Sequence, residues 1–306
     1  MPLFKRIFTM DTIKQCRKRL LPAMGVVMLG LFLYWIIHYR ETILGSFRRV
    51  GVFPLGLLVV VMIISLYLTV SALVVLVRGK GYTSFGFSDA YHALNLSQLA
   101  SMIPGGIWGF AGFAGYLWTK GISKVDSVVV IFLNTLIMLT ACAIVGFSSL
   151  ISILHPLYAL ISLLPFILLV LMRDRLDALR KKYYLDSSSL PSKFTLLKAL
   201  SISFLVWMLM SFGFAGFVLA GNGSQAVSPW MIAGAYAAGY LAGYLAVFVP
   251  SGLGVSEGVI TLILGPFMGV EQVLAVSVSF RIIHVLVVWC NILISVLLTS
   301  RAHWKN

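Results

Sequence analysis

Two ionisable side chains, Glu257 and Arg281, stand within stretches of sequence that are otherwise apolar. An ionised group in hydrocarbon costs about 3 kcal/mol or more, so each is expected to face a partner or a water-filled cavity. In one interpretation the two side chains form a pair that fixes local structure. In the other, Arg281 binds an anionic head group. The two interpretations are compatible if a ligand competes for the pair.

Arg281 belongs to a polar stripe in the last apolar stretch of the chain. Its members follow one another at intervals of four, three and seven residues, which places them on one face of a helix. They are Ser277, Arg281, His284 and Asn291. His284 is therefore a candidate binding residue beside Arg281.

Glu257 follows a segment of residues that interrupt helices. Pro250 removes a backbone donor and clashes one turn back, while Gly252 and Gly254 permit a sharp turn or a close backbone approach. A helix that restarts after such a break presents free N–H groups and the positive end of its dipole. We therefore expect Gly252 and Gly254 to help bind a phosphate.

A similar break, Pro104-Gly105-Gly106, lies far upstream. Both breaks follow sequence of small and apolar residues, and both share the pattern proline, small residue, glycine. Gly105 and Gly106 are candidates for the same binding role as the downstream glycines. Two similar broken segments in the two halves of a chain are typical of a transporter built as an internal repeat.

The stretch before Pro250 carries two further faces. Tyr236, Tyr240 and Tyr244 recur every four residues, and they either pack in the protein or line an amphipathic cavity in which Tyr240 would contact a ligand. Gly239 and Gly243 lie on another face, which is expected to pack against a neighbouring helix.

A competing chemistry is suggested by Gly254-Val255-Ser256-Glu257-Gly258, which satisfies the G-x-S-x-G pattern of serine hydrolases, with His284 downstream. That nucleophile requires a strand, a strained turn and a helix. The context here is helical and rich in glycine. No metal-ligand spacing, phosphate-binding glycine loop or dinucleotide fingerprint is present, so neither a metal nor a cofactor is expected.

The composition excludes a soluble globular protein. Hydrophobic residues make up 60% and charged residues 10% of the 306 residues, and several runs exceed the length of a membrane span. The net charge of +14 comes from short basic segments beside these runs, as the positive-inside rule and anionic lipids favour. We therefore expect no nucleic-acid binding. Cys16, Cys142 and Cys290 are expected to be unpaired.

The hydrophobic pattern predicts an all-α integral membrane protein with about six transmembrane helices. The spans are expected near Leu20–Ile37, Phe53–Val77, Val125–Ser148, Leu157–Met172, Leu196–Leu219 and Val273–Leu298. The segment with Arg40, Arg48 and Arg49 is expected to be a short outer loop, and residues 173–193 a cytoplasmic loop. Both termini are placed in the cytoplasm by their basic residues.

Two segments between the spans are expected to be re-entrant helical hairpins that turn at Pro104 and Pro250. Such hairpins are possible only where protein surrounds them. Residues 1–19 would then be a basic cytoplasmic arm, residues 20–300 one membrane domain, and residues 301–306 a cytoplasmic tail. The domain divides into repeats of about 20–150 and 156–300, which are inverted relative to each other.

At the two breaks the chain resembles the membrane region of lysylphosphatidylglycerol synthetases and their stand-alone, flippase-like relatives. The resemblance rests on Pro104-Gly105-Gly106, Gly121-Ile122-Ser123, Pro250-Ser251-Gly252-Leu253-Gly254, Glu257 and Arg281. It implies a polytopic helical domain that binds or moves lipids at a central cavity. The soluble synthetase domain of two-domain members does not follow here, so the resemblance does not imply lipid aminoacylation. Relatives often carry charged residues after the first break, where this chain has Phe110, Phe113 and Asn134.

Together these features predict a plasma-membrane lipid transporter, flippase-like in character, whose cargo is an anionic or phosphate-bearing lipid or a lipid-linked sugar. Two alternatives belong to other classes. One is a non-transporting membrane partner of a glycosyltransferase or lipid synthetase, and the other is an intramembrane serine hydrolase. The sequence does not specify an oligomeric state.

Overall fold

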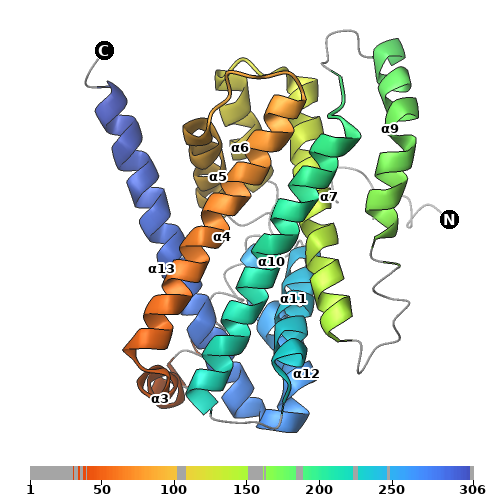
Figure 1. Ribbon diagram of the computed structural model, residues 1–306. Helices are drawn as coiled ribbons and strands as arrows, with labels where there is room; N and C mark the ends of the chain where they lie inside the picture. The colour runs from red at the N-terminus through yellow and green to blue at the C-terminus, as the bar shows by residue number, and fades with distance from the viewer. Residues whose placement is uncertain are drawn as a thin grey trace, which may run out of the picture.

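The computed structural model describes residues 40–101, 108–150, 163–183, 189–222, 227–246 and 249–303, together with Gly30, Tyr34, Ile37, His38 and Ile161. Within these residues every regular element is a helix and none is a strand (Figure 1). The predicted all-helical class is therefore confirmed.

Four helices are long and apolar enough to cross a membrane. They are α4 (Val52–Gly79), α7 (Lys124–Ser149), α10 (Lys193–Asn222) and α13 (Val270–His303). The shortest has 26 residues, which corresponds to roughly 39 Å and exceeds a hydrocarbon core of about 30 Å. These helices match four of the predicted spans.

The other two predicted spans fall partly outside the described residues. Most of 20–37 lies there, as does the first part of 157–172. The second part begins α9 (Leu164–Tyr183), which continues as a helix through the first half of the basic segment expected to be a loop. The leucine, alanine, arginine and lysine residues of that segment favour a helix.

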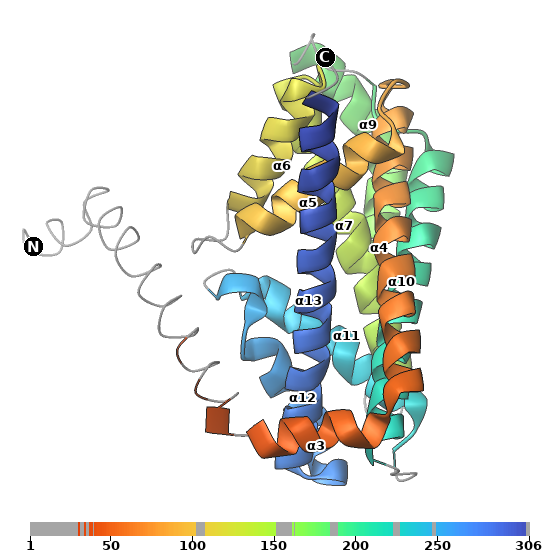
Figure 2. The same ribbon diagram turned by 90° about the vertical axis from the view of Figure 1, so that its left-hand side faces the viewer.

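The expected outer loop is also a helix, α3 (Arg40–Val50). Ile43, Phe47 and Val50 recur at helical spacing and pack against the ends of α10 and α13. Figure 2 shows α3 lying across the end of the bundle, nearly perpendicular to α13. The expectation of a loop was wrong because this apolar face specifies a helix.

Two pairs of short helices lie between the long ones. The first pair is α5 (Phe87–Ser101) and α6 (Trp108–Thr119), and the second is α11 (Pro229–Leu245) and α12 (Val255–Met268). None exceeds 17 residues, so none is longer than roughly 26 Å. In Figure 2 the first pair occupies the upper half of the bundle and the second pair the lower half.

Small residues hold each pair together. A Cβ added to Gly239 would lie 2.8 Å from the Ser256 carbonyl oxygen, and one added to Gly112 would lie 3.0 Å from the Ala100 Cβ. The helix backbones therefore approach as closely as glycine permits. The prediction that Gly239 and Gly243 pack against a neighbouring helix is confirmed.

Eight helices form two sets of four, α4 to α7 and α10 to α13, whose contacts match. Within each set, the short helices pack together and the last long helix packs on the second of them. Between the sets, α4 packs along α10, α5 packs on α13, and α11 packs on α7. Each short pair is thus held against the last long helix of the other set.

The largest buried cluster joins α4, α10, α11, α12 and α13. At its centre Phe214 of α10 stacks on Tyr236 with ring centroids 5.1 Å apart and meets Phe280 edge-on at 5.0 Å. Such aromatic pairs add to the close packing that drives helix association in a membrane. This cluster fixes α11 and α12 against α13, and so positions Glu257 opposite Arg281.

Candidate functional site

The break after α11 is a tight turn whose backbone depends on glycine. Gly252 and Gly254 have φ angles of 65° and 81°, and Ser251 has a φ angle of 51°, which a serine rarely adopts. A Cβ on Gly252 would lie 2.6 Å from the Gly243 Cα, so the turn touches the α11 backbone. Pro250 begins a single turn of 3₁₀-helix, η1 (Pro250–Gly252).

Glu257 and Arg281 form an ion pair beside this turn. Arg281 Nη1 donates to Glu257 Oε1 at 2.5 Å, and Arg281 Nη2 donates to the backbone carbonyl of Ser251. The other carboxylate oxygen, Glu257 Oε2, accepts from the Gly254 N–H at 2.8 Å. Both oxygens of Glu257 therefore have a partner, and the pair holds the turn to α13.

Glu257 and Arg281 differ in exposure and in the number of hydrogen bonds that each could still form. The Glu257 side chain is 3% exposed and the Arg281 side chain 17% exposed. A guanidinium carries five N–H donors, and contacts within the described residues account for two of them. Arg281 can therefore bind a further acceptor without leaving Glu257, whereas the Glu257 carboxylate only accepts hydrogen bonds and is almost fully buried.

The pair lies deep along α13. Arg281 is 11 residues beyond Val270, roughly 17 Å along the helix, within an apolar stretch of 28 residues. The positive end of the α12 dipole and its first N–H groups lie beside Glu257 and strengthen its interaction with Gly254. The same helix end would favour a phosphate.

His284 lies one turn further along α13, where it is half-buried and within electrostatic range of Arg281. It has no hydrogen-bond partner among the described residues. Tyr236 and Tyr240 also interact electrostatically with Arg281. Both pack on Trp207, with the Tyr240 ring 4.5 Å from it, so these tyrosines pack in the core and also lie near the site.

Ser256 of the G-x-S-x-G pattern lies in the first turn of α12, in a helical context. Its side chain fills the space beside Gly243. No hydrogen bond joins it to His284 in the described part of the chain. This arrangement favours a packing role for Ser256.

The upstream break, Pro104-Gly105-Gly106, lies outside the described residues. The helices α5 and α6 flank this break. At their ends away from the break they are joined by an ion pair, in which Lys120 Nζ lies 2.7 Å from Asp89 Oδ1. Burial raises the pKa of Asp89, but hydrogen bonds from Lys120 and the Gly86 N–H outweigh burial and hold the pKa below its usual value.

The polar stripe of α13 reaches the first pair of helices as well as the second. Tyr91 donates to the Asn291 carbonyl oxygen at 2.9 Å, and His92 Nδ1 lies 2.6 Å from Ser295 Oγ. One helix face thus contacts α5 through Asn291 and the α11–α12 turn through Arg281. Sequence analysis predicted this shared face and Glu257 as a partner of Arg281, but not the contacts with α5.

A second ion pair was not predicted. Lys80 Nζ lies 2.6 Å from Asp126 Oδ1, and both side chains are fully buried. Tyr82 donates to Asp126 Oδ2 at 2.6 Å, and its pKa is raised by burial and by this bond, so it remains a neutral donor. The sequence offers one indication of this region's structure. Ser123 precedes Asp126 by three residues, and its side chain caps α7 by accepting from the Asp126 N–H. The network ties the end of α4 to the start of α7.

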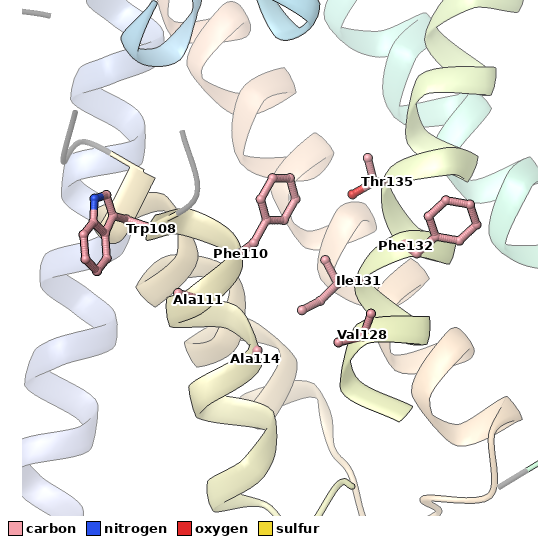
Figure 3. Close-up of a pocket in the computed structure, with 8 residues that line it drawn as sticks. All are labelled: Trp108, Phe110, Ala111, Ala114, Val128, Ile131, Phe132 and Thr135. Atoms are coloured by element: carbon pink, nitrogen blue, oxygen red, sulfur yellow. The ribbon is translucent and has the colours of Figure 1, made fainter. Parts of the chain in front are cut away.

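An apolar groove of about 600 Å³ lies between α6 and α7 (Figure 3). Its lining residues are Trp108, Phe110, Ala111, Ala114, Val128, Ile131, Phe132 and Thr135. Figure 3 shows Phe110 and Ile131 pointing into the gap from opposite helices. Helix α7 also packs on α11, so the groove adjoins a helix that contacts the second pair. Its lining suits a hydrocarbon chain.

Among the described residues, no group of three or more histidine, cysteine, aspartate or glutamate side chains is placed to bind a metal ion. Cys142 and Cys290 are both free thiols, as predicted, and Cys16 lies outside the described residues. Comparison with protein-family models gave no match, and comparison with curated protein sequences gave none either. The resemblance to the membrane region of lysylphosphatidylglycerol synthetases therefore stays a prediction from the two breaks and from Glu257 and Arg281.

Proposed function

We propose that this protein binds an anionic lipid at Arg281 and moves it between the two leaflets of a membrane. The observation that carries this proposal is the Arg281 guanidinium, which lies deep along an apolar helix and keeps N–H donors beyond those bound to Glu257 and Ser251. A phosphate accepts such donors well. Ionisable groups at this depth often mark a substrate pathway.

The groove between α6 and α7 supports a lipid rather than a small soluble anion as cargo. An amphipathic ligand needs a charged site for its head group and an apolar surface for its chains. Arg281 supplies the first, and the groove lined by Phe110 and Ile131 supplies the second. Helix α7, which forms one wall of the groove, packs on α11, the helix that leads into the Arg281 turn.

The proposed arrangement in the membrane has six transmembrane helices and two re-entrant hairpins, α5–α6 and α11–α12, in inverted repeats. Three observations support it. The helices of both pairs are too short to cross a hydrocarbon core of about 30 Å. The helix contacts of the two sets match. Arg78, Lys80 and Lys193 lie where α4 ends and α10 begins, which is the upper end of the bundle in Figure 1, and this supports placing that end on the cytoplasmic side of the membrane.

Labelling of single cysteines tests this arrangement. A cysteine at Ala302 should react with an impermeant reagent only from the cytoplasm, and one at Ser224 only from outside. Cytoplasmic labelling at both Ser224 and Ala302 would remove the inverted arrangement, since α13 crosses the membrane once and residues 229–268 would then have to cross it as well.

Reconstitution tests the movement of lipid. Vesicles that contain the protein and a trace of tail-labelled fluorescent phosphatidylglycerol are treated with an impermeant reductant. Wild-type protein should expose the inner-leaflet probe faster than protein-free vesicles do, and Arg281→Gln should lose this increase. Arg175→Gln, at an exposed arginine on α9, is the matched control and should behave as wild type. Absence of movement by the folded wild type would favour a non-transporting partner of a glycosyltransferase or lipid synthetase.

A further inference from the structure

Helix α3 places three arginines at the end of the bundle where the positive-inside rule expects few. Arg40, Arg48 and Arg49 are all exposed. The rule is a bias rather than a prohibition, but the charges still require an environment that favours them. The helix dipole accounts in part for Arg48 and Arg49, which lie in the last turn. It does not account for Arg40, which lies in the first turn.

The opposite face of α3 is fixed to the protein. Ile43, Ser46 and Val50 are buried, and Ile43 and Phe47 pack with Leu274 and Val278 of α13. Val50 also lies 3.0 Å from the position that a Cβ on Gly221 of α10 would take. The helix is therefore a fixed part of the bundle, and the orientation of its exposed face is set by this packing.

The position of α3 along the bundle is that of a membrane interface. Gly51, with a φ angle of 76°, is the one residue between α3 and α4, so α3 lies where an apolar span begins. Figure 2 shows it crossing the bundle axis. Leu44, Val52 and Phe53 are exposed at 48%, 88% and 83% beside the arginines. Exposed basic side chains of α3 thus adjoin exposed apolar side chains of α3 and of the start of α4, an arrangement that suits the boundary between head groups and acyl chains, where an arginine stem can be buried while its charge stays at the surface.

From this placement we infer that α3 binds the head groups of anionic phospholipids in the leaflet opposite the basic end of the bundle. The arginines supply charge and N–H donors for the phosphates, and Leu44, Val52 and Phe53 enter the adjoining acyl region. One acid, Glu41, lies on the helix and approaches Arg40 at 3.5 Å, where it competes with a phosphate. Because the same helix packs on Val278, one turn before Arg281, bound lipids would gather near the proposed cargo site.

The enrichment of anionic lipid beside α3 can be measured directly. A fluorophore is attached at Leu44→Cys, with the three native cysteines replaced by alanine, and the protein is placed in mixed phosphatidylglycerol and phosphatidylcholine vesicles. A spin-labelled quencher is carried on either lipid. Quenching by phosphatidylglycerol should exceed quenching by phosphatidylcholine, by up to about fivefold for each arginine that contributes. High salt should reduce the difference.

Variants and a control position decide the role of the arginines. Arg48→Gln with Arg49→Gln should lower the quenching ratio toward that at Leu262→Cys, an exposed apolar position on α12, and leave only the contribution of Arg40. Glu41→Gln should raise the ratio. Equal ratios at positions 44 and 262 in the wild type, or an unchanged ratio after both arginine substitutions, would overturn the inference. The experiment measures lipid contact at α3, so it tests this inference whether or not the protein moves lipid.

Discussion

The Glu257–Arg281 pair predicts unequal losses of stability when its two members are neutralised. Arg281→Gln leaves a carboxylate that is 3% exposed with one remaining partner, the Gly254 N–H. Glu257→Gln leaves a guanidinium that is 17% exposed and still bound to the Ser251 carbonyl. Breaking a buried pair costs about 3–5 kcal/mol. We expect Arg281→Gln to lie near the upper figure and Glu257→Gln near or below the lower one.

The hydrogen bond from Arg281 to the turn adds to this difference. Arg281 donates to the carbonyl oxygen of Ser251, and a hydrogen bond from a charged group contributes about 1.5–3 kcal/mol. Arg281→Gln releases this contact, whereas Glu257→Gln keeps it. In the double variant no uncompensated charge remains, and the amide carbonyl oxygen that Glu257→Gln introduces can still accept from the Gly254 N–H. The double variant should therefore be more stable than Arg281→Gln alone.

Heating of the detergent-purified protein, followed by the amount that stays monodisperse, measures these differences. The expected order of stability is wild type, Glu257→Gln, the double variant, and then Arg281→Gln, with the two middle variants close together. Arg175→Gln, at an exposed arginine, should match the wild type. If Glu257→Gln were as destabilising as Arg281→Gln, or if the double variant were the least stable, the assignment of roles within the pair would be refuted.

Three further predictions concern the contacts that position the site. Asp126→Asn leaves the fully buried Lys80 without its counter-charge and should lower stability by about 3–5 kcal/mol, whereas an effect near zero in the same heating assay would mean that the pair is not maintained. Gly239→Ala forces a Cβ to 2.8 Å from the Ser256 carbonyl oxygen and should lower stability by about 1–3 kcal/mol. The control Gly115→Ala lies in open space on α6 and should be neutral or stabilising by up to about 1 kcal/mol. Similar effects of the two substitutions would contradict the packing of α11 on α12. Because hydrogen bonds hold the pKa of Asp89 below its usual value, its pair with Lys120 should stabilise the protein at pH 7 by about 1 kcal/mol or less. The difference in stability between wild type and Asp89→Asn should shrink as the pH falls through the lowered pKa.

Sequence reasoning could identify the Glu257–Arg281 pair because few ionisable groups lie inside the apolar stretches. An ion in hydrocarbon needs a partner, and for each of these two side chains the other was the evident partner. The role of each was not predictable. It depends on Gly254 and Ser251, whose backbone groups become partners only once the turn has its left-handed geometry.

The Lys80–Asp126 pair was missed for a related reason. Lys80 ends an apolar span and Asp126 begins another, and charges at such positions are typical of a membrane boundary rather than of a buried pair. Burial at such a boundary depends on how the loop with Tyr82 folds over it. The contacts of Tyr91 and His92 with Asn291 and Ser295 join residues about 200 positions apart, and no local pattern indicates them. Helix α3 was detectable in principle from the spacing of Ile43, Phe47 and Val50.

The central claim is that Arg281 serves the lipid as well as the fold, and lipid movement by the Glu257→Gln, Arg281→Gln double variant tests it most directly. This variant is chosen because it removes the cationic ligand while avoiding the uncompensated charge left by Arg281→Gln. Reconstituted as folded protein in phosphatidylglycerol vesicles, it should show no movement above that of protein-free vesicles, while Glu257→Gln should retain measurable movement. Movement at the wild-type rate by the double variant would contradict the claim and leave Arg281 with a purely structural role.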